Sequence, residues 1–289
     1  MLVFTLPAKG DLYCWIFTMK NIEKVHIGDH RFCIFANDTG VSKTIKDTGN
    51  YGFGELKVYD DILNDGDLFV DVGMNIGAIS FFLKKRRPDV RIIGFEPIRE
   101  YAQLAVQNLA DFDAVEVFNF AVGVDNKFLR APNIALDRQF NFGATQIGNQ
   151  DTGALIAQVS IDQFFAGSGA RPRLLKIDTE GGEFEVIQGA TSLFHSDLII
   201  SYEADRPSTV EKCMEFLKPY GVTQFAAVLA IVDRRGMGDD HPYSKLSTVH
   251  MFACFGAVPT WVERLGRKID DFEAYQAFIS PVLARQRHK

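Results

Sequence analysis

The chain has 289 residues, of which 47% are hydrophobic, and a formal net charge of −6 at pH 7. A chain of this length can bury a large core, and we expect one elaborated catalytic domain with additions at both ends. The net negative charge argues against a nucleic-acid-binding protein, because phosphate binding depends on clustered Lys and Arg. The dense basic run Lys84-Lys85-Arg86-Arg87 is expected to be the solvated last turn of a helix.

The four cysteines, Cys14, Cys33, Cys213 and Cys254, are far apart and form neither a CxxC pair nor a His-Cys cluster. This spacing predicts buried thiols in a reducing compartment rather than a zinc site or a disulfide framework. No segment reaches the roughly 20 apolar residues that a membrane helix needs, and no convincing cleavage site follows the apolar start of the chain. We therefore expect a cytoplasmic protein with no membrane partner.

The first 50 residues mix aromatic and β-branched residues with turn signals such as Gly28-Asp29 and Asp38-Thr39-Gly40. This pattern predicts an N-terminal β-rich cap of a few short strands rather than helices. Helical apolar spacing over residues 54–63 then opens a catalytic domain that we expect to cover residues 51–258. The remaining residues, 259–289, are predicted to form an amphipathic helical tail.

Strand and helix patterns then alternate, as in a parallel sheet covered by helices. The predicted strands are residues 68–72, 90–95, 115–122, 173–177 and 198–202, and the predicted helices are residues 76–86, 100–110, 161–165, 182–189 and 208–219. Residues 225–232 and 249–255 are expected to pair antiparallel at the sheet edge. The alternation of strands and helices is interrupted at about residues 123–160, where scattered Gly, Asn and Gln predict an insertion of loops or a hairpin.

Two acids follow neighbouring predicted strands. Asp71 ends the first strand and leads into Gly73, Asn75 and Gly77, and the second strand ends at Glu96. Parallel sheets bind ligands at this edge, where glycines let a ligand approach the backbone. Asp71 can hydrogen-bond a cationic amino group or organise the turn, and an acid at the place of Glu96 can accept both hydroxyls of a ribose.

The glycine spacing separates two cofactor classes. A dinucleotide site needs GxGxxG, but Met74 and Asn75 leave no second glycine here to admit a pyrophosphate. Asp71 would also repel a pyrophosphate, whereas a ligand that carries an ammonium and a sulfonium suits this acid. A nicotinamide-dependent oxidoreductase is therefore disfavoured. The third strand end, residues 119–122, is where an adenine would lie, with Phe120 or Val122 in apolar contact.

The fourth strand leads into Asp178-Thr179-Glu180, and the fifth strand ends at Glu203. Carboxylates from neighbouring strand ends can raise one another's pKa, and a raised carboxylate is a usable base for a hydroxyl. Asp178, Glu180 and Glu203 are therefore candidate catalytic residues. The alternative remains open that Asp178 and Glu203 bind a divalent cation such as Mg²⁺, which takes hard oxygen ligands.

Other polar and aromatic residues have simpler interpretations. Glu183 is expected to cap the helix that it opens, at the positive end of that helix. The histidines have no metal-pair spacing, so a structural role is expected for each, including His250 in its strand. Phe140 and Phe142 in the insertion are expected to pack in the core or a lid, with the floor of an acceptor pocket as the alternative.

At this point the sequence resembles the FkbM family of methyltransferases. The Phe-Glu-Pro and Lys-Ile-Asp-x-Glu-Gly segments are specific for this family among methyltransferases, and Met74 replaces the alanine that is usual in the first turn. The match covers roughly residues 50–222 in the right order and spacing. The matching residues are 69–77, 94–97, 108–109, 121–123, 175–183, 187–190 and Glu203.

The resemblance implies a class I methyltransferase (Rossmann-like) fold, with a mostly parallel seven-stranded sheet flanked by helices. It implies S-adenosyl-L-methionine as cofactor and O-methylation of a hydroxyl on a sugar, glycan or natural product. The residues that it places at the cofactor are Tyr51, Glu55, Asp71, Gly73, Asn75, Gly77, Glu96, Pro97, Ala121 and Asp178. A non-catalytic module that binds the cofactor remains an alternative. No Asp/Asn-Pro-Pro-aromatic segment follows the fourth strand, which disfavours methylation of an exocyclic base nitrogen.

Overall fold

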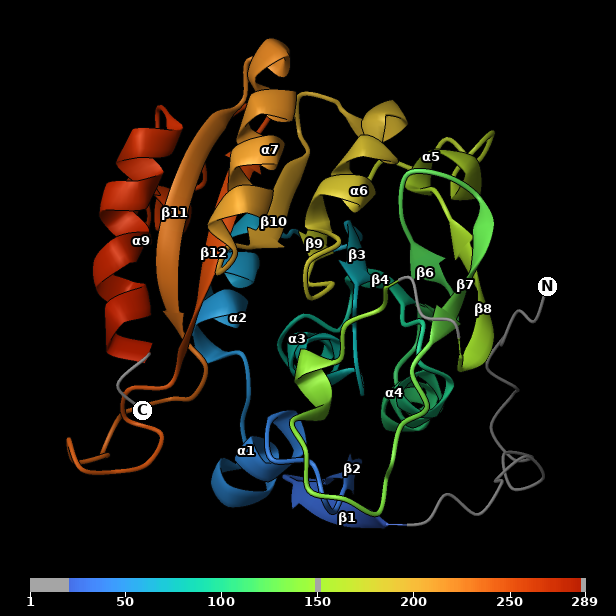
Figure 1. Cartoon of the computed structure of the whole chain (residues 1–289). Coiled ribbons are helices and arrows are strands. Elements are labelled where there is room, and N and C mark those ends of the chain that lie inside the picture. Colours follow the sequence, from blue (N-terminus) through green and yellow to red (C-terminus); the bar gives the residue numbers. More distant parts are fainter. Residues whose placement is uncertain (1–20, 149–151, 287–289) are drawn as a thin grey trace.

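A computed structural model of the chain describes residues 21–148 and 152–286, which fold around one large sheet with helices on both faces (Figure 1). The order of the strands is β13-β11-β12-β10-β9-β3-β4-β5. Seven of them form the predicted sheet, and the two-residue β13 adds an eighth strand at the edge. The bounds are β3 Leu68–Val72, β4 Arg91–Phe95, β5 Val115–Phe118, β9 Leu174–Ile177, β10 Ile199–Glu203, β11 Thr223–Ala230, β12 Ser247–Cys254 and β13 Arg267–Lys268.

The sheet is mostly parallel, as predicted for a class I methyltransferase fold. Strands β5, β4, β3, β9 and β10 run parallel to one another. Strand β12 runs antiparallel between β10 and β11, which confirms the predicted antiparallel pair at this end of the sheet. The chain order reverses between β3 and β9, and such a switch point is where open parallel sheets bind ligands. The carboxyl ends of β3, β4, β9 and β10 therefore meet at one edge.

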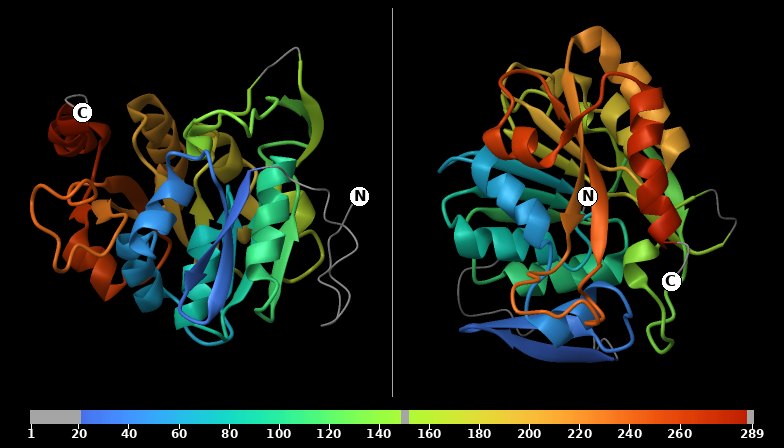
Figure 2. Two further views of the ribbon diagram at one scale, coloured as in Figure 1. Left: turned by 90° about the horizontal axis from the view of Figure 1, so that it is seen from below. Right: turned by 90° about the vertical axis from the view of Figure 1, so that its left-hand side faces the viewer.

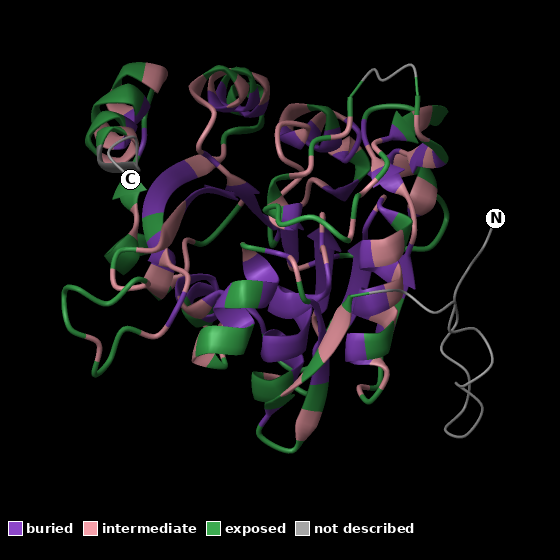
Figure 3. Cartoon of the chain, turned by 60° about the horizontal axis from the view of Figure 1, so that its bottom comes forward, coloured by how far each residue is buried: buried purple, intermediate pink, exposed green. Residues whose placement is uncertain are grey.

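Successive side chains along each strand point to opposite faces of the sheet and pack into two separate hydrophobic cores. In β3, Val70 packs on one face of the sheet and Phe69 on the other. The buried residues concentrate in the strands and on the helix surfaces that face them (Figure 3). One face carries α2 Phe53–Ile62, α3 Ala78–Arg86 and α4 Arg99–Leu109, and the other carries α5 Ile161–Phe164, α6 Glu183–Gln188, α7 Pro207–Leu217 and α9 Phe272–Gln286.

The predicted N-terminal strands are present as a hairpin of β1 Ile22–Ile27 and β2 His30–Phe35. The hairpin lies outside the helix layer (Figure 2), where Cys33 exchanges two hydrogen bonds with the side chain of Asn108 on α4. The prediction of strands alone was wrong, because Val41–Thr48 forms helix α1. Asp38 accepts hydrogen bonds from the N–H groups of Gly40 and Ser42 and so organises the start of this helix. Residues 1–20 of the predicted cap, including Cys14, lie outside the described residues.

The predicted third strand, 115–122, is divided in two. Asn119 donates hydrogen bonds to the carbonyl groups of Glu96 and Pro97, and the chain leaves the main sheet there. The following strand joins a three-stranded sheet made with the insertion, whose order is β6-β8-β7. The antiparallel pair β7–β8 confirms the predicted hairpin within the insertion. The bounds are β6 Ala121–Val122, β7 Lys127–Ala131 and β8 Ala154–Val159.

The remaining elements are short. The described part of the tail contains the helices α8 and α9, with β13 between them. The bounds are α8 Thr260–Leu265, η1 Phe142–Ala144, η2 Thr191–Leu193 and η3 Lys218–Tyr220.

The basic run at the end of α3 is not wholly solvated, which corrects the prediction. Lys84 is buried, and its ammonium group donates to the carbonyl oxygens of Pro88 and Val90. Of the cysteines in the described ranges, Cys33, Cys213 and Cys254 are all buried free thiols, as predicted. No helix within residues 21–148 and 152–286 is long and apolar enough to cross a membrane.

Candidate active site

A cavity of about 990 Å³ lies at the carboxyl ends of β3, β4, β9 and β10. This volume is at the upper end of the range for small-molecule sites. The structure brings ten of the residues predicted for the site to this one cavity. They are Tyr51, Glu55, Gly73, Asn75, Glu96, Pro97, Ala121, Asp178, Glu180 and Glu203.

The turn after β3 brings bare backbone to the cavity wall. Gly73 and Asn75 both have left-handed backbone, with φ of 77° and 52°. A Cβ atom at Gly73 would lie 1.8 Å from the carbonyl oxygen of Asp178, so no other residue fits there without moving β9. The N–H groups of Gly73 and Met74 donate to the carbonyl of Phe95, which fixes the turn against β4. The glycine is therefore required by a close approach of two strand ends.

Glu96 is held in place by the backbone. Its Oε2 accepts a hydrogen bond from the N–H of Asn75 (2.9 Å), and its Oε1 accepts one from the N–H of Ile98 (2.8 Å). Each carboxylate oxygen keeps a second lone pair that can accept a further bond from a ligand hydroxyl. Burial raises the pKa of Glu96 to about 7, although the two N–H groups act in the opposite direction.

Asp71 and Gly77 do not reach the cavity, which corrects their prediction as direct contacts. Asp71 alternates with Val70 and Val72, so it faces α3 and is fully buried. The hydroxyl of Ser80 donates to Asp71 Oδ2 at 2.7 Å. Gly77 packs against α4, where a Cβ atom would meet Ala105 at 3.3 Å. Asp71 Oδ1 accepts a hydrogen bond from Lys176 Nζ at 3.2 Å, so both of its oxygens have partners within the protein.

The third strand end lines the cavity as expected from the sequence. Phe120, Ala121 and Val122 all contribute to the wall beyond Glu96 and Pro97. Phe120 stacks on Phe118 at a ring separation of 6.2 Å, so the apolar surface continues into the core. This part of the cavity offers apolar contact rather than charge.

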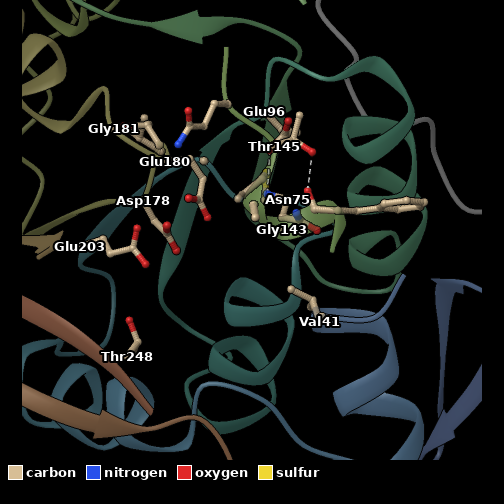
Figure 4. Close-up of a pocket in the computed structure, with 18 of the residues that line it drawn as sticks. Val41, Asn75, Glu96, Gly143, Thr145, Asp178, Glu180, Gly181, Glu203 and Thr248 are labelled. Atoms are coloured by element: carbon tan, nitrogen blue, oxygen red, sulfur yellow. Dashed lines mark hydrogen bonds between the residues drawn. The ribbon is translucent and has the colours of Figure 1, made fainter. Parts of the chain in front are cut away.

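Three carboxylates gather on the opposite side. Asp178, Glu180 and Glu203 each offer an oxygen, and these oxygens all lie within 4.8 Å of one another. Figure 4 shows this group across the cavity from Asn75 and Glu96. Burial first, and then the neighbouring acids, raise the pKa of Glu203 to about 10. Burial and the charge of Asp178 raise the pKa of Glu180 to about 7.

Two cations that the sequence reasoning missed bind these acids. Lys176 is buried, and its Nζ lies 3.2 Å from Asp71 Oδ1 and 3.4 Å from Asp178 Oδ2. Burial lowers the pKa of Lys176, but the charges of Asp71 and Asp178 outweigh it and hold the pKa above its usual value. Arg206 pairs with Glu180 and Glu203. The position of Lys176 inside an otherwise apolar strand could have indicated its role from the sequence. Arg206 follows the end of β10 and belongs to no motif that would have identified it.

Four buried polar side chains, Glu55, Tyr59, Ser201 and His250, lie near Lys176 and form hydrogen bonds with one another. Tyr59 donates to Glu55 Oε1 at 3.2 Å, and Ser201 shares a hydrogen bond with His250 Nδ1 at 3.0 Å. Burial raises the pKa of Glu55 to about 7 and lowers the pKa of His250 to about 4. The imidazole is therefore neutral at pH 7, so its 3.6 Å approach to Glu55 is no ion pair. His250 has the satisfied structural role that was predicted, and it also lines the cavity.

Glu183 holds the turn before α6 rather than capping the helix that it opens, which differs from the prediction. Its Oε1 accepts hydrogen bonds at 3.0 Å from the N–H groups of Thr179 and Gly181 and from the Thr179 hydroxyl. Glu180, two residues after Asp178, has a left-handed φ of 56°. The turn held by Glu183 thus fixes the backbone that carries two of the three carboxylates.

Segments outside the main sheet close the cavity. They are residues 39–44 around the start of α1, residues 141–148 of the insertion, and residues 242–246 between β11 and β12. Phe142 is buried, in agreement with the predicted packing role, and it also lines the cavity. Phe140 is half exposed and lines a smaller neighbouring cavity instead.

Comparison with known proteins supports the sequence resemblance. The family model described as "Methyltransferase FkbM domain" matches residues 71–237. No curated protein matches the chain. Solved structures that share the fold include the O-methyltransferase TomG from Streptomyces achromogenes, with 16% identity, a TM-score of 0.43, and coverage of 71% of this chain and 79% of that one.

A putative O-methyltransferase from Klebsiella pneumoniae has 14% identity and a TM-score of 0.42, with 71% of this chain and 79% of that one covered. A precorrin-6y C5,15-methyltransferase from Geobacter metallireducens GS-15 has 17% identity and a TM-score of 0.41, with 68% and 85% covered. Likeness at this level says nothing about the methyl acceptor. The family match spans more than half of the chain, and the chain therefore belongs to the FkbM family of S-adenosylmethionine-dependent methyltransferases.

Proposed function

We propose that this methyltransferase acts on a hydroxyl group of an uncharged or cationic small molecule or glycan. The observation that carries the proposal is the meeting of Asp178, Glu180 and Glu203 in the cavity that also holds Glu96. A hydroxyl acceptor needs a group that takes its proton, and carboxylates placed together supply one.

The residues of the turn fit S-adenosylmethionine. Gly73 and Asn75 present backbone at the wall, and Glu96 keeps lone pairs for two hydroxyls of a ribose. The apolar surface at Phe120 and Ala121 suits an adenine. The cofactor supplies a methyl group that its sulfonium has activated. The protein must align the acceptor oxygen and hold its proton.

Among the three carboxylates, we assign the proton acceptor to Glu180. A base works best when its pKa lies near the working pH, and the pKa of Glu180 is raised to about 7. Burial and the neighbouring acids raise the pKa of Glu203 further, so we leave Glu203 to hold the acceptor through a hydrogen bond. Asp178 would orient the acceptor hydroxyl between them.

The charges around the cavity constrain the acceptor. Among the described residues that line it, two are cations, Lys176 and Arg206, and seven are acids: Glu55, Glu96, Asp178, Glu180, Glu185, Glu203 and Asp205. This excess repels phosphate and carboxylate groups, which supports an acceptor other than nucleic acid. Buried free thiols in turn support a reducing compartment, and we propose the cytoplasm.

Calorimetric titration with S-adenosylmethionine and S-adenosylhomocysteine tests the cofactor site. We expect the wild type to bind both ligands and Glu96→Gln to lose about 10- to 100-fold in affinity, because hydrogen bonds to a charged group contribute roughly 1.5–3 kcal/mol. Glu116→Gln, on the exposed part of β5, is the matched control and should bind normally. Absence of binding to the wild type would remove the proposed function.

Transfer of a labelled methyl group tests the acceptor class. Neutral sugars and amino sugars should accept the label, whereas their phosphorylated forms and RNA should not. Glu180→Gln should lower the rate at saturating cofactor without changing cofactor affinity. Efficient methylation of RNA or of a sugar phosphate would contradict the charge argument, and methylation of carbon or nitrogen would contradict the proposed hydroxyl acceptor.

A further inference from the structure

A guanidinium group lies among the carboxylates at the ends of β9 and β10. Arg206 Nη2 is 2.5 Å from Glu180 Oε2, and Arg206 Nη1 is 3.0 Å from Glu203 Oε2 and 2.8 Å from Asp205 Oδ1. One side chain thus joins acids from two different strand ends. A guanidinium is always charged and presents its donors in a fixed planar fork, so the three acids are held in one arrangement.

The position of Arg206 is set by the local backbone. It stands at the end of the segment that leaves β10 and directly precedes Pro207, the first residue of α7, with φ of −112° and ψ of 94°. A proline keeps the residue before it extended. On the other side the arginine packs against Gly181, where a Cβ atom would lie 3.7 Å from Arg206 Cδ, an ordinary contact distance. The proline therefore favours the observed backbone at Arg206.

Two of these acids, Glu180 and Glu203, also form a group with Asp178 that has the spacing of a cation site. Oxygens of Asp178, Glu180 and Glu203 lie within 4.8 Å of one another, and such carboxylates suit Mg²⁺ or Mn²⁺. The guanidinium already bonds two of the three, so a metal ion and Arg206 compete for the same oxygens. The charge of either cation relieves the repulsion between the acids.

We propose that Arg206 is a positioning residue that occupies the cation position of this carboxylate group and takes the place of a divalent metal ion. Arg206 then orients Glu180 and Glu203 toward the cavity and leaves the second oxygen of each free for an acceptor. The sequence allowed either a divalent cation bound by Asp178 and Glu203 or a site without a metal ion, and a guanidinium in the cation position corresponds to the site without a metal ion. The proposal needs neither the cofactor nor the acceptor to be tested.

Titration with Mn²⁺, followed by electron paramagnetic resonance, tests the proposal. The wild type should bind no Mn²⁺ at equimolar concentration. Arg206→Gln should bind one ion, with an affinity gain of at least about tenfold, because a unit charge a few ångströms away no longer opposes the metal. Arg206→Lys, which keeps the charge, should exclude Mn²⁺ as the wild type does. The gain should disappear in Arg206→Gln combined with Glu203→Gln.

Arg235→Gln is the matched control, because Arg235 also pairs with an acid, Asp233, but is largely exposed outside the carboxylate group. It should bind no Mn²⁺. Stoichiometric binding to the wild type that Asp178→Asn abolishes would overturn the proposal, and so would failure of Arg206→Gln to gain the ion. Thermal unfolding checks that each variant folds, and the wild-type titration decides the first outcome whether or not a variant folds. A merely structural arginine would not create a metal site on removal.

Discussion

The two sides of the cavity are built by different means. On the turn side, which comprises Gly73, Asn75 and Glu96, backbone N–H groups hold the polar atoms. On the carboxylate side, which comprises Asp178, Glu180 and Glu203, charged side chains from other positions hold them. A site made by backbone tolerates changes of nearby charge but not an added Cβ atom. A site made by charges should show the opposite sensitivity.

The largest effect is expected on the carboxylate side, from Lys176→Met. The ammonium group is buried between Asp71 and Asp178, and its loss leaves Asp71 as an unpaired buried charge. Removing one partner of a buried pair costs about 3–5 kcal/mol, so the free energy of unfolding should fall by that amount. Urea denaturation at pH 7.5 measures it.

Two further variants separate charge from packing. Adding Asp71→Asn to Lys176→Met should restore much of the lost stability, because no buried carboxylate then remains without its cation. Lys127→Met removes an exposed partner of Asp125 and should change little. If the double variant were no more stable than the single one, packing rather than charge would hold this side together.

The next effect is expected on the turn side, from Gly73→Ala. A side chain there is strained by the φ of 77°, and its Cβ atom would lie 1.8 Å from the carbonyl oxygen of Asp178. Gly66 has a similar φ of 83° but nothing within 4 Å of the position of a Cβ atom. Gly66→Ala should therefore cost only the backbone strain, about 1–2 kcal/mol, and Gly73→Ala clearly more. Equal losses in chemical denaturation would mean that β9 yields easily and that the turn is not held by close approach.

A third prediction concerns Glu55, which lines the same cavity and, within the part of the chain that the structure describes, forms no ion pair with a lysine or arginine. Its pKa is raised from 4.5 to about 7 by burial, so the folded state keeps a proton that the unfolded state loses near pH 4.5. The wild type therefore has its full stability from this group below pH 4.5 and loses it as the pH rises to 7.

Glu55→Gln cannot titrate, so above pH 7 it should be more stable than the wild type by up to about 3 kcal/mol. The difference should vanish at pH 4.5, and urea denaturation at several pH values measures it. Glu116→Gln, at an exposed position, should show no such trend. A variant less stable than the wild type at pH 8 would indicate that Lys176 keeps Glu55 ionised and that charge outweighs burial here.

The two sides also differ in how far the sequence predicted them. Glycines and an acid at fixed spacing after two strands identified the turn side, because local backbone geometry requires them. Asp71 was misplaced, although strand alternation with the apolar Val70 and Val72 already directs it to the α3 face. The acids of the carboxylate side were found at strand ends, but Arg206 was not. A single cation outside any motif becomes visible only when strands distant in sequence are brought together.

The walls of the cavity were the least predictable part, because each depends on contacts between distant segments. Asp38 joins the N-terminal segment to the insertion by accepting a hydrogen bond from the N–H of Phe142. The hydroxyl of Tyr243, in the connection between β11 and β12, donates to Asp47 Oδ2 on α1 at 2.6 Å. Side-chain contacts of this kind leave no periodic pattern in the sequence. The helix α1 is different, because Val41 and Ile45 have helical spacing and Gly49 ends the helix in left-handed backbone, so its signals were present in the sequence.

The smallest effect is therefore expected at such a wall, from Tyr243→Phe. The variant loses one exposed hydrogen bond, so the free energy of unfolding should change by no more than about 1 kcal/mol. Cofactor affinity should stay at the wild-type value, because the turn side lies elsewhere in the cavity. Amide hydrogen exchange should become faster at Ser244 and Leu246, whose N–H groups bond within this connection, while β10 and β12 stay protected. Tyr220→Phe, at another exposed tyrosine, should leave these amides unchanged. Unchanged exchange in Tyr243→Phe would show that the wall is held by its backbone, like the turn side, and would weaken the distinction between the two ways of building this cavity.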